Sequence, residues 1–247
     1  FIVVGTPSGI RLSPEDGAHQ SIITPSIGIE LPEVDFYEPC FAQELEWIIL
    51  GGMRKILDRD KSTYLRLSTR RIDQSLFTLP DNKDDQERLR KQVVSGAYLI
   101  IDRRNDTKYD VNSNVVNIFA SGVMVPEAIL ASNSLLEEGL FANVINVTGA
   151  GPLFRSFESF NKSIFKGETS ESFMSNILPD YDARVPIVSV VDGHSHSLAW
   201  IGGALKTSII SLGVSEFGQS GLPRDLYKEN NIDSESIIEA CFTALDN

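Results

Sequence analysis

Apolar and polar stretches alternate along the chain in a way that predicts an α/β fold. The chain begins with the apolar run Phe1 to Val4, closed by a glycine and a proline, which is typical of a parallel strand buried on both faces. A helix is predicted from Glu38-Pro39 onward, because proline is tolerated in the first turn and apolar residues then recur at helical spacing. Further strands are predicted at Val34 to Tyr37, Tyr64 to Leu67 and Ala97 to Asp102.

The second half of the chain alternates regularly between strand and helix signals. This alternation predicts a mostly parallel sheet flanked by helices. The predicted strands are Val115 to Ala120, Asn143 to Val147, Val185 to Val191 and Ser208 to Leu212. The predicted helices are Pro126 to Glu138, Leu153 to Phe165, Ser170 to Ile177 and Ser234 to Leu245.

A polar run, RRNDTKYDVNSN at Arg103 to Asn114, lies between the two alternating regions and predicts an interdomain linker. We therefore predict an α/β protein with two mostly parallel sheets flanked by helices. The domains would be residues 1–103 and 115–247, with residues 104–114 as the linker.

Composition narrows the choice of partners and location. The 247 residues carry a formal net charge of −12, so nucleic acid and anionic membrane surfaces would be repelled. No apolar run approaches the roughly 20 residues of a membrane span. Cys40 and Cys241 are far apart in sequence, which fits a reducing, cytoplasmic location better than a disulfide framework. Because Phe1 starts a strand with no lead-in, we expect a piece of a longer polypeptide.

The polar loop Ser13 to Thr24 follows the first predicted strand and holds His19, the best catalytic candidate. Glu15 and Asp16 are close enough in sequence to fix the tautomer of this imidazole or to raise its pKa. Gly17 allows a tight turn between them. The alternative is a hydrogen-bonded surface histidine without a chemical role.

Two other polar spots follow predicted strands. Arg70 and Arg71 could bind a carboxylate bidentately, although salt bridges to surface acids are the simpler expectation. His194 and His196, next to Asp192, have a spacing that can ligate a metal. No further ligands occur at a recognisable spacing, so a role in loop structure or at a subunit interface is the simpler expectation. A serine hydrolase is not indicated, because no GxSxG motif is present.

Four stretches of the sequence resemble a known superfamily. PEDGAHQS at Pro14 to Ser21 and VDFYEPCFAQELE at Val34 to Glu46 resemble the second half of the pyrimidine-binding domain of transketolase-like thiamine diphosphate enzymes. The tail from Ser208 to Leu245 resembles the transketolase C-terminal domain. TYLRLSTRRIDQ at Thr63 to Gln74 is more similar to the homodimeric, decarboxylating first component of 2-oxoacid (pyruvate) dehydrogenase complexes than to sugar transketolases.

The resemblance implies an enzyme that decarboxylates a 2-oxoacid with thiamine diphosphate and Mg²⁺ and passes the acyl group to a lipoyl-bearing acyltransferase. The implied catalytic residue is His19, with Glu15, Asp16, Gln20 and Arg70 as substrate-binding residues. The resemblance also implies a homodimer. The predicted helix after Pro39 is apolar around much of its circumference, and this surface could be buried either at the dimer interface or in the core of the domain.

The superfamily's GDG motif, which holds the diphosphate and Mg²⁺, is absent from this sequence. The resemblance therefore implies a C-terminal fragment that lacks the N-terminal portion of its enzyme, binds no cofactor and is inactive alone. No cofactor-binding or metal-binding residue can be assigned. Two alternatives stay open: a transketolase that transfers ketol groups between phosphosugars, and a non-catalytic assembly or dimerisation subunit.

Overall fold

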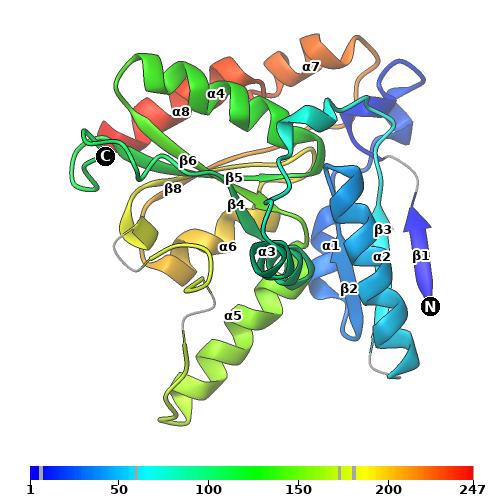
Figure 1. Ribbon diagram of the computed structural model, residues 1–247. Helices are drawn as coiled ribbons and strands as arrows, with labels where there is room; N and C mark the ends of the chain where they lie inside the picture. Colours follow the sequence, from blue (N-terminus) through cyan, green and yellow to red (C-terminus); the bar gives the residue numbers. More distant parts are fainter. Residues whose placement is uncertain (6–7, 59–60, 172–173, 180–181, 247) are drawn as a thin grey trace.

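The computed structural model describes residues 1–5, 8–58, 61–171, 174–179 and 182–246. It contains two sheets that lie side by side, each flanked by helices (Figure 1). This architecture confirms the predicted α/β class with two mostly parallel sheets.

The first sheet has three parallel strands in the order β1-β3-β2: β1 is Ile2–Gly5, β3 is Ser62–Arg66 and β2 is Val34–Tyr37. Helices α1 (Thr24–Glu30) and α2 (Ala42–Leu57) cover it. Gly28 of α1 lies against Phe36, whose partner in β3 is Tyr64, whereas Gly52 of α2 lies against Thr63. Because adjacent residues of a strand point to opposite faces, the two helices pack on opposite faces of this sheet.

The second sheet has five strands in the order β4-β6-β5-β7-β8. The strands are β4 Tyr98–Ile101, β6 Phe141–Val147, β5 Val115–Ser121, β7 Ile187–Val190 and β8 Ile209–Leu212. Helices α4 (Val125–Glu137) and α8 (Ser234–Asp246) lie on one face, and α5 (Ala150–Phe165) and α6 (His196–Leu205) lie on the other (Figure 1). Every residue of the central strands β5 and β6 is buried, as helices on both faces require.

The predicted domain boundary is wrong for one strand. β4 was expected to belong to residues 1–103, but it pairs antiparallel with β6, with Tyr98 opposite Asn146. Residues 104–114 therefore connect two strands of the same sheet. The run is polar because it forms an exposed turn with its own hydrogen bonds, in which the Asp110 carboxylate accepts from the Asn112 backbone N and the Ser113 hydroxyl. The chain passes between the sheets earlier, between β3 and β4, through helix α3 (Lys83–Ser95).

Several helices differ from their predicted extents. Helix α2 begins at Ala42, a few residues later than predicted, because the Glu44 carboxylate accepts a hydrogen bond from the backbone N of Phe41 and so fixes the start of the helix. The predicted helix Ser170 to Ile177 includes residues 172–173, which lie outside the described part; residues 174–177 form a turn. Helices α1, α6 and α7 (Pro223–Glu229) were not predicted. None of the described helices combines the length and the apolar character that crossing a membrane requires.

Candidate functional site

Three buried charged residues meet where the two sheets approach one another. Arg66 ends β3, Glu38 follows β2 and Asp192 follows β7, so all three lie at carboxyl ends of parallel strands. Such strand ends are where α/β proteins place their chemistry. The Arg66 guanidinium donates to the Glu38 carboxylate through Nη1 and to the backbone O of Asp192 through Nη2, at 2.8 Å for the second bond.

The two carboxyl groups of this cluster share one guanidinium group, that of Arg66. Burial raises the pKa of both Glu38 and Asp192, and the attraction of Arg66 opposes that rise. The Asp192 carboxylate also accepts from the backbone N of Ile10 at 2.9 Å. It occupies the space beside Gly9, where a Cβ atom would come within 2.2 Å of Asp192 Oδ2. The cluster is therefore a fixed anchor for the chain segment that leads into the His19 loop.

The His19 loop is also held by the segment that follows β8. Gly17 lies so close to Gly218 that a Cβ atom on Gly17 would be 2.1 Å from the Gly218 carbonyl oxygen. Beside this contact, the Gln20 side-chain amide donates to the backbone O of Gln219 at 2.7 Å. Ser13 makes two further bonds to Gly221, one in each direction. A segment about two hundred residues away in sequence thus fixes the loop.

His19 itself is exposed and ends the short 3-10 helix Gly17–His19. Glu15 and Asp16 are exposed as well. Asp16 does not hold the imidazole as expected, because its carboxylate caps the 3-10 helix by accepting from the backbone N of Ala18 at 3.1 Å. The loop therefore presents the His19 ring to solvent from a braced base.

Arg70 forms the salt bridge that was the simpler sequence-based expectation. Its Nη2 donates to Glu127 Oε1 at 2.7 Å, its Nη1 donates to the backbone O of Val123, and its guanidinium stacks over the ring of Tyr227. A cavity of about 620 Å³ brings Arg70 and Arg11 to one wall. Because Glu127 already neutralises Arg70, a carboxylate ligand would have to compete with that bond.

The two histidines after β7 contact each other. The Nδ1 atoms of His194 and His196 are 2.6 Å apart, and the backbone N of His194 donates to the carbonyl of Ile22, near the end of the His19 loop. Among the described residues, no group of three or more His, Cys, Asp or Glu side chains is arranged to hold a metal ion. The bond to Ile22 uses only the backbone of His194, so the structure assigns no role to either imidazole.

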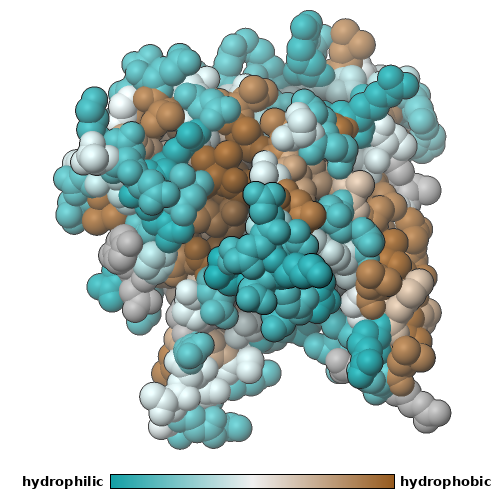
Figure 2. Space-filling model, in the orientation of Figure 1, coloured by the Kyte–Doolittle hydropathy of each residue, from teal (hydrophilic) through white to brown (hydrophobic). Residues whose placement is uncertain are grey.

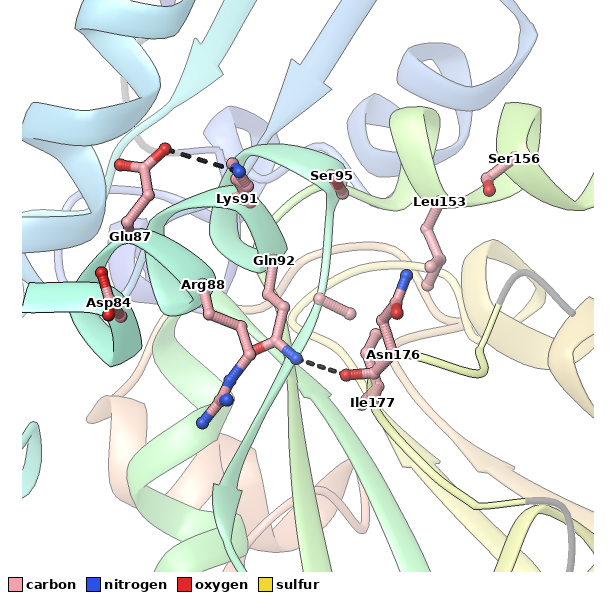
Figure 3. Close-up of a pocket in the computed structure, with 11 residues that line it drawn as sticks. Asp84, Glu87, Arg88, Lys91, Gln92, Ser95, Leu153, Ser156, Asn176 and Ile177 are labelled. Atoms are coloured by element: carbon pink, nitrogen blue, oxygen red, sulfur yellow. Dashed lines mark hydrogen bonds and ion pairs between the residues drawn. The ribbon is translucent and has the colours of Figure 1, made fainter. Parts of the chain in front are cut away.

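A second cavity, of about 490 Å³, lies between α3 and α5 (Figure 3). Its polar wall comes from α3, where Lys91 faces Glu87 and the Gln92 amide donates to the backbone O of Asn176. Three charged residues of this wall are paired within α3 itself: Arg88 with Asp85, and Lys91 with Glu87. None of the strand-end residues described above lines it, so we place the candidate site at the junction of the sheets.

The sequence reasoning missed the buried role of four residues, one of which, Asp192, it had named only as a possible metal ligand. They are Glu38, Arg66 and Asp192 at the junction, and Glu44 in α2. The available signal was positional: Arg66 and Glu38 interrupt or directly follow apolar strand runs, and a charged residue in such a place is either a strand end or a buried partner.

A family model described as the transketolase-like TK C-terminal domain matches residues 96–233. The chain belongs to this family. The start of the match at residue 96 agrees with the assignment of β4 to the second sheet. This match confirms the resemblance to the transketolase-like superfamily that the His19 loop and the C-terminal tail indicated.

Curated relatives of this transketolase-like chain include both transketolases and pyruvate dehydrogenase components. A 6-deoxy-6-sulfo-D-fructose transketolase subunit from Clostridium sp. is 29% identical over 150 residues, covering 61% of this chain and 39% of the relative. The pyruvate dehydrogenase E1 component of Mycolicibacterium smegmatis is 25% identical over 99% of this chain and 26% of its own length. The chain therefore spans well under half the length of these relatives.

A solved structure shows the same fold. The transketolase from Leishmania mexicana matches 99% of this chain and 30% of its own chain, with a TM-score of 0.68 and 21% identity. The transketolase-like arrangement of the two sheets is therefore that of a known enzyme architecture.

The described residues do not form a site for Mg²⁺ and a diphosphate. No cluster of three or more metal-ligating side chains is present among them. The junction carboxylates are already bonded, Glu38 to Arg66 and Asp192 to the backbone N of Ile10.

Proposed function

We propose that this chain is the substrate-facing part of a thiamine diphosphate-dependent 2-oxoacid dehydrogenase component. It would work with a further portion of the enzyme that holds the cofactor and Mg²⁺. The observation that supports this most is the exposed His19 ring on a loop braced by Gly17, Gln20 and the segment after β8. A fixed imidazole of this kind can orient a substrate oxygen or exchange a proton with it.

The further portion of the enzyme needs a surface on which to dock, and one side of the first sheet provides it. β1 is an edge strand, and Phe1, Val3 and Val4 are exposed on it. The neighbouring face of α2 exposes Leu50, Met53, Ile56 and Leu57. Figure 2 shows hydrophobic residues on this side of the molecule. An apolar face next to an open sheet edge is typical of a surface that a partner covers, here the cofactor-holding portion within a homodimer.

Charge around the loop favours a small 2-oxoacid over a phosphosugar. A phosphate group carries about 1.5 to 2 negative charges and is best bound by several cations. The loop has Arg11 nearby, whereas Arg70 is paired with Glu127. A 2-oxoacid presents one charge, which a single arginine can match. The acyl product would then pass to a lipoyl-bearing acyltransferase.

The substrate class has a direct assay. The chain, assembled with the remaining portion of its enzyme, thiamine diphosphate and Mg²⁺, should release CO₂ from pyruvate or 2-oxobutyrate. These two substrates differ by one methylene, worth only about 1 to 3 kcal/mol, so either is compatible with the proposal. Xylulose 5-phosphate with an aldose acceptor should give ketol transfer at a rate at least about tenfold lower. Efficient ketol transfer without decarboxylation would instead assign a transketolase, and no activity with any substrate would favour an assembly subunit.

The chain alone should have negligible affinity for thiamine diphosphate with Mg²⁺. The reason is that neither a GDG motif nor a cluster of three metal ligands occurs in the described residues. Isothermal titration calorimetry of the chain by itself should show no saturable heat at ligand concentrations up to about 1 mM. Stoichiometric micromolar binding would contradict the proposal that the other portion of the enzyme holds the cofactor.

A further inference from the structure

Arg66 stands out among the buried charges because its guanidinium bonds three different segments at once. Nη1 donates to Glu38 after β2, Nη2 donates to the backbone O of Asp192 after β7, and Nε donates to Ser8 Oγ at 2.7 Å. Its side chain is only 6% exposed. Each of its three nitrogens therefore has a specific partner, which a planar fork of donors can provide and a single ammonium group cannot.

Ser8 connects this anchor to the far end of the His19 loop. While its hydroxyl accepts from Arg66, its carbonyl oxygen accepts from the backbone N of Ser21. The Ser8–Ser21 bond closes the loop at its base, and Ser21 is two residues beyond His19. The next segment of the loop base is fixed from the same cluster, since Asp192 accepts from the backbone N of Ile10.

We propose that Arg66 is a positioning residue for His19 and acts through Ser8 and the closure of the loop base. The inference rests on the proposed function of His19 but concerns a residue that does not touch the reacting atoms. Its physical basis is that a displacement of about 1 Å in a catalytic group can lower a rate by about two orders of magnitude. The segment after β8 holds the loop beside His19, at Gly17 and Gln20, and the link from Arg66 through Ser8 holds its base, so the position of the ring depends on both supports.

The proposal predicts that the effects of Arg66 and His19 are not additive. In the assembled enzyme, Arg66→Lys should lower kcat by about 10- to 100-fold and change KM by less than about threefold. In a His19→Ala background, the same change should lower kcat by less than about twofold, because there is no imidazole left to misplace. A double-mutant cycle on CO₂ release from pyruvate measures this coupling.

Arg155→Lys provides the matched control. Arg155 also binds a buried carboxylate, that of Asp35, and its side chain is 20% exposed. Asp35 is near the amino end of β2, at the opposite end of the sheet from the His19 loop. Whatever factor Arg155→Lys costs should therefore be the same with and without His19. A merely structural role for Arg66 would give that additive result as well, and would overturn the proposal.

Ser8→Ala is a second variant that tests the same proposal if Arg66→Lys fails to fold. It deletes only the hydroxyl that accepts from Nε and leaves the Ser21 bond to the Ser8 carbonyl in place. We expect a loss in kcat of about 3- to 10-fold that disappears in the His19→Ala background. A Ser8→Ala effect that is absent, or undiminished without His19, would overturn the inference. A His19→Ala variant with full activity would instead refute the proposed function itself.

Discussion

Replacing His19 by alanine in the assembled enzyme should lower turnover by roughly two to four orders of magnitude, the range expected when a general acid or base is lost. The exposed ring sits on a braced loop, so its removal deletes the chemistry and leaves the scaffold. Turnover is measured as CO₂ release from pyruvate at saturating substrate. The dissociation constant for thiamine diphosphate should stay within about threefold of that of the wild type, because cofactor-holding groups are assigned to the other portion.

His196→Ala is the control for this prediction. His196 is also exposed, but its ring contacts His194 and does not belong to the His19 loop. We expect its turnover to stay within about threefold of wild type. If His19→Ala and His196→Ala gave equal rates, His19 would be an ordinary surface histidine.

Replacing Glu44 by alanine should lower the free energy of unfolding by about 3 to 5 kcal/mol, the cost of breaking a buried charged network. Glu44 is fully buried and joins α2 to the second sheet. Its Oε2 accepts from the backbone N of Cys40 and Phe41, at 2.7 and 2.9 Å. Its Oε1 accepts from Tyr98 Oη and Asn146 Nδ2, both at 2.6 Å. Alanine leaves all of these donors unsatisfied, which urea denaturation of the chain would measure.

Glu44→Gln should be much milder, costing about 1 to 2 kcal/mol. The glutamine oxygen can keep both backbone bonds. Its amide nitrogen then faces Tyr98 Oη and Asn146, whose Oδ1 is buried without a partner among the described residues. A flipped Asn146 amide would let Oδ1 accept from the new donor. Equal losses for the alanine and glutamine variants would show that the network contributes no more than the filled space.

A comparison of the wild type with Glu44→Gln tests the ionisation of Glu44. Burial raises the pKa of Glu44 to about 7 from its ordinary 4.5, although the hydrogen bonds from Tyr98 and Phe41 oppose that rise. The folded state therefore holds the proton more tightly than the unfolded state. This contribution to stability is complete below pH 4.5 and is lost as the pH rises to about 7, by roughly 3 kcal/mol at about 1.4 kcal/mol per pKa unit.

Glu44→Gln cannot titrate, so the stability of the wild type relative to this variant should fall as the pH rises from 5 to 7.5. Urea unfolding at several pH values in that range gives the difference directly. A difference that is flat with pH would mean that the four hydrogen bonds outweigh burial and keep Glu44 ionised throughout.

Local patterns were enough to predict the elements that this site depends on. The apolar run Phe1 to Val4 predicted a strand, and the structure has β1 at Ile2–Gly5, with the His19 loop later in the same connection. Patterns of period two and 3.6 arise from burial of one face, and they survive whatever the tertiary partners are.

Local patterns do not tell which distant segment of the chain a strand or loop will contact. The run Ala97 to Asp102 reads as a strand, but nothing within it tells that it pairs with β6 instead of β3. Likewise, Gly218 and Gln219 brace the His19 loop from a distant part of the chain. The position of Arg66 after an apolar strand run does not identify its partners either, because Asp192 and Ser8 come from separate segments.

The central claim is that this chain completes a decarboxylating site that neither it nor the rest of the enzyme forms alone. The most direct measurement is CO₂ release from pyruvate, with thiamine diphosphate and Mg²⁺ present, by the remaining portion of the enzyme, by this chain, and by the two together. The account predicts release only in the mixture, rising with added chain until the two portions are equimolar. Release by the remaining portion alone, at a rate that added chain does not change, would contradict it.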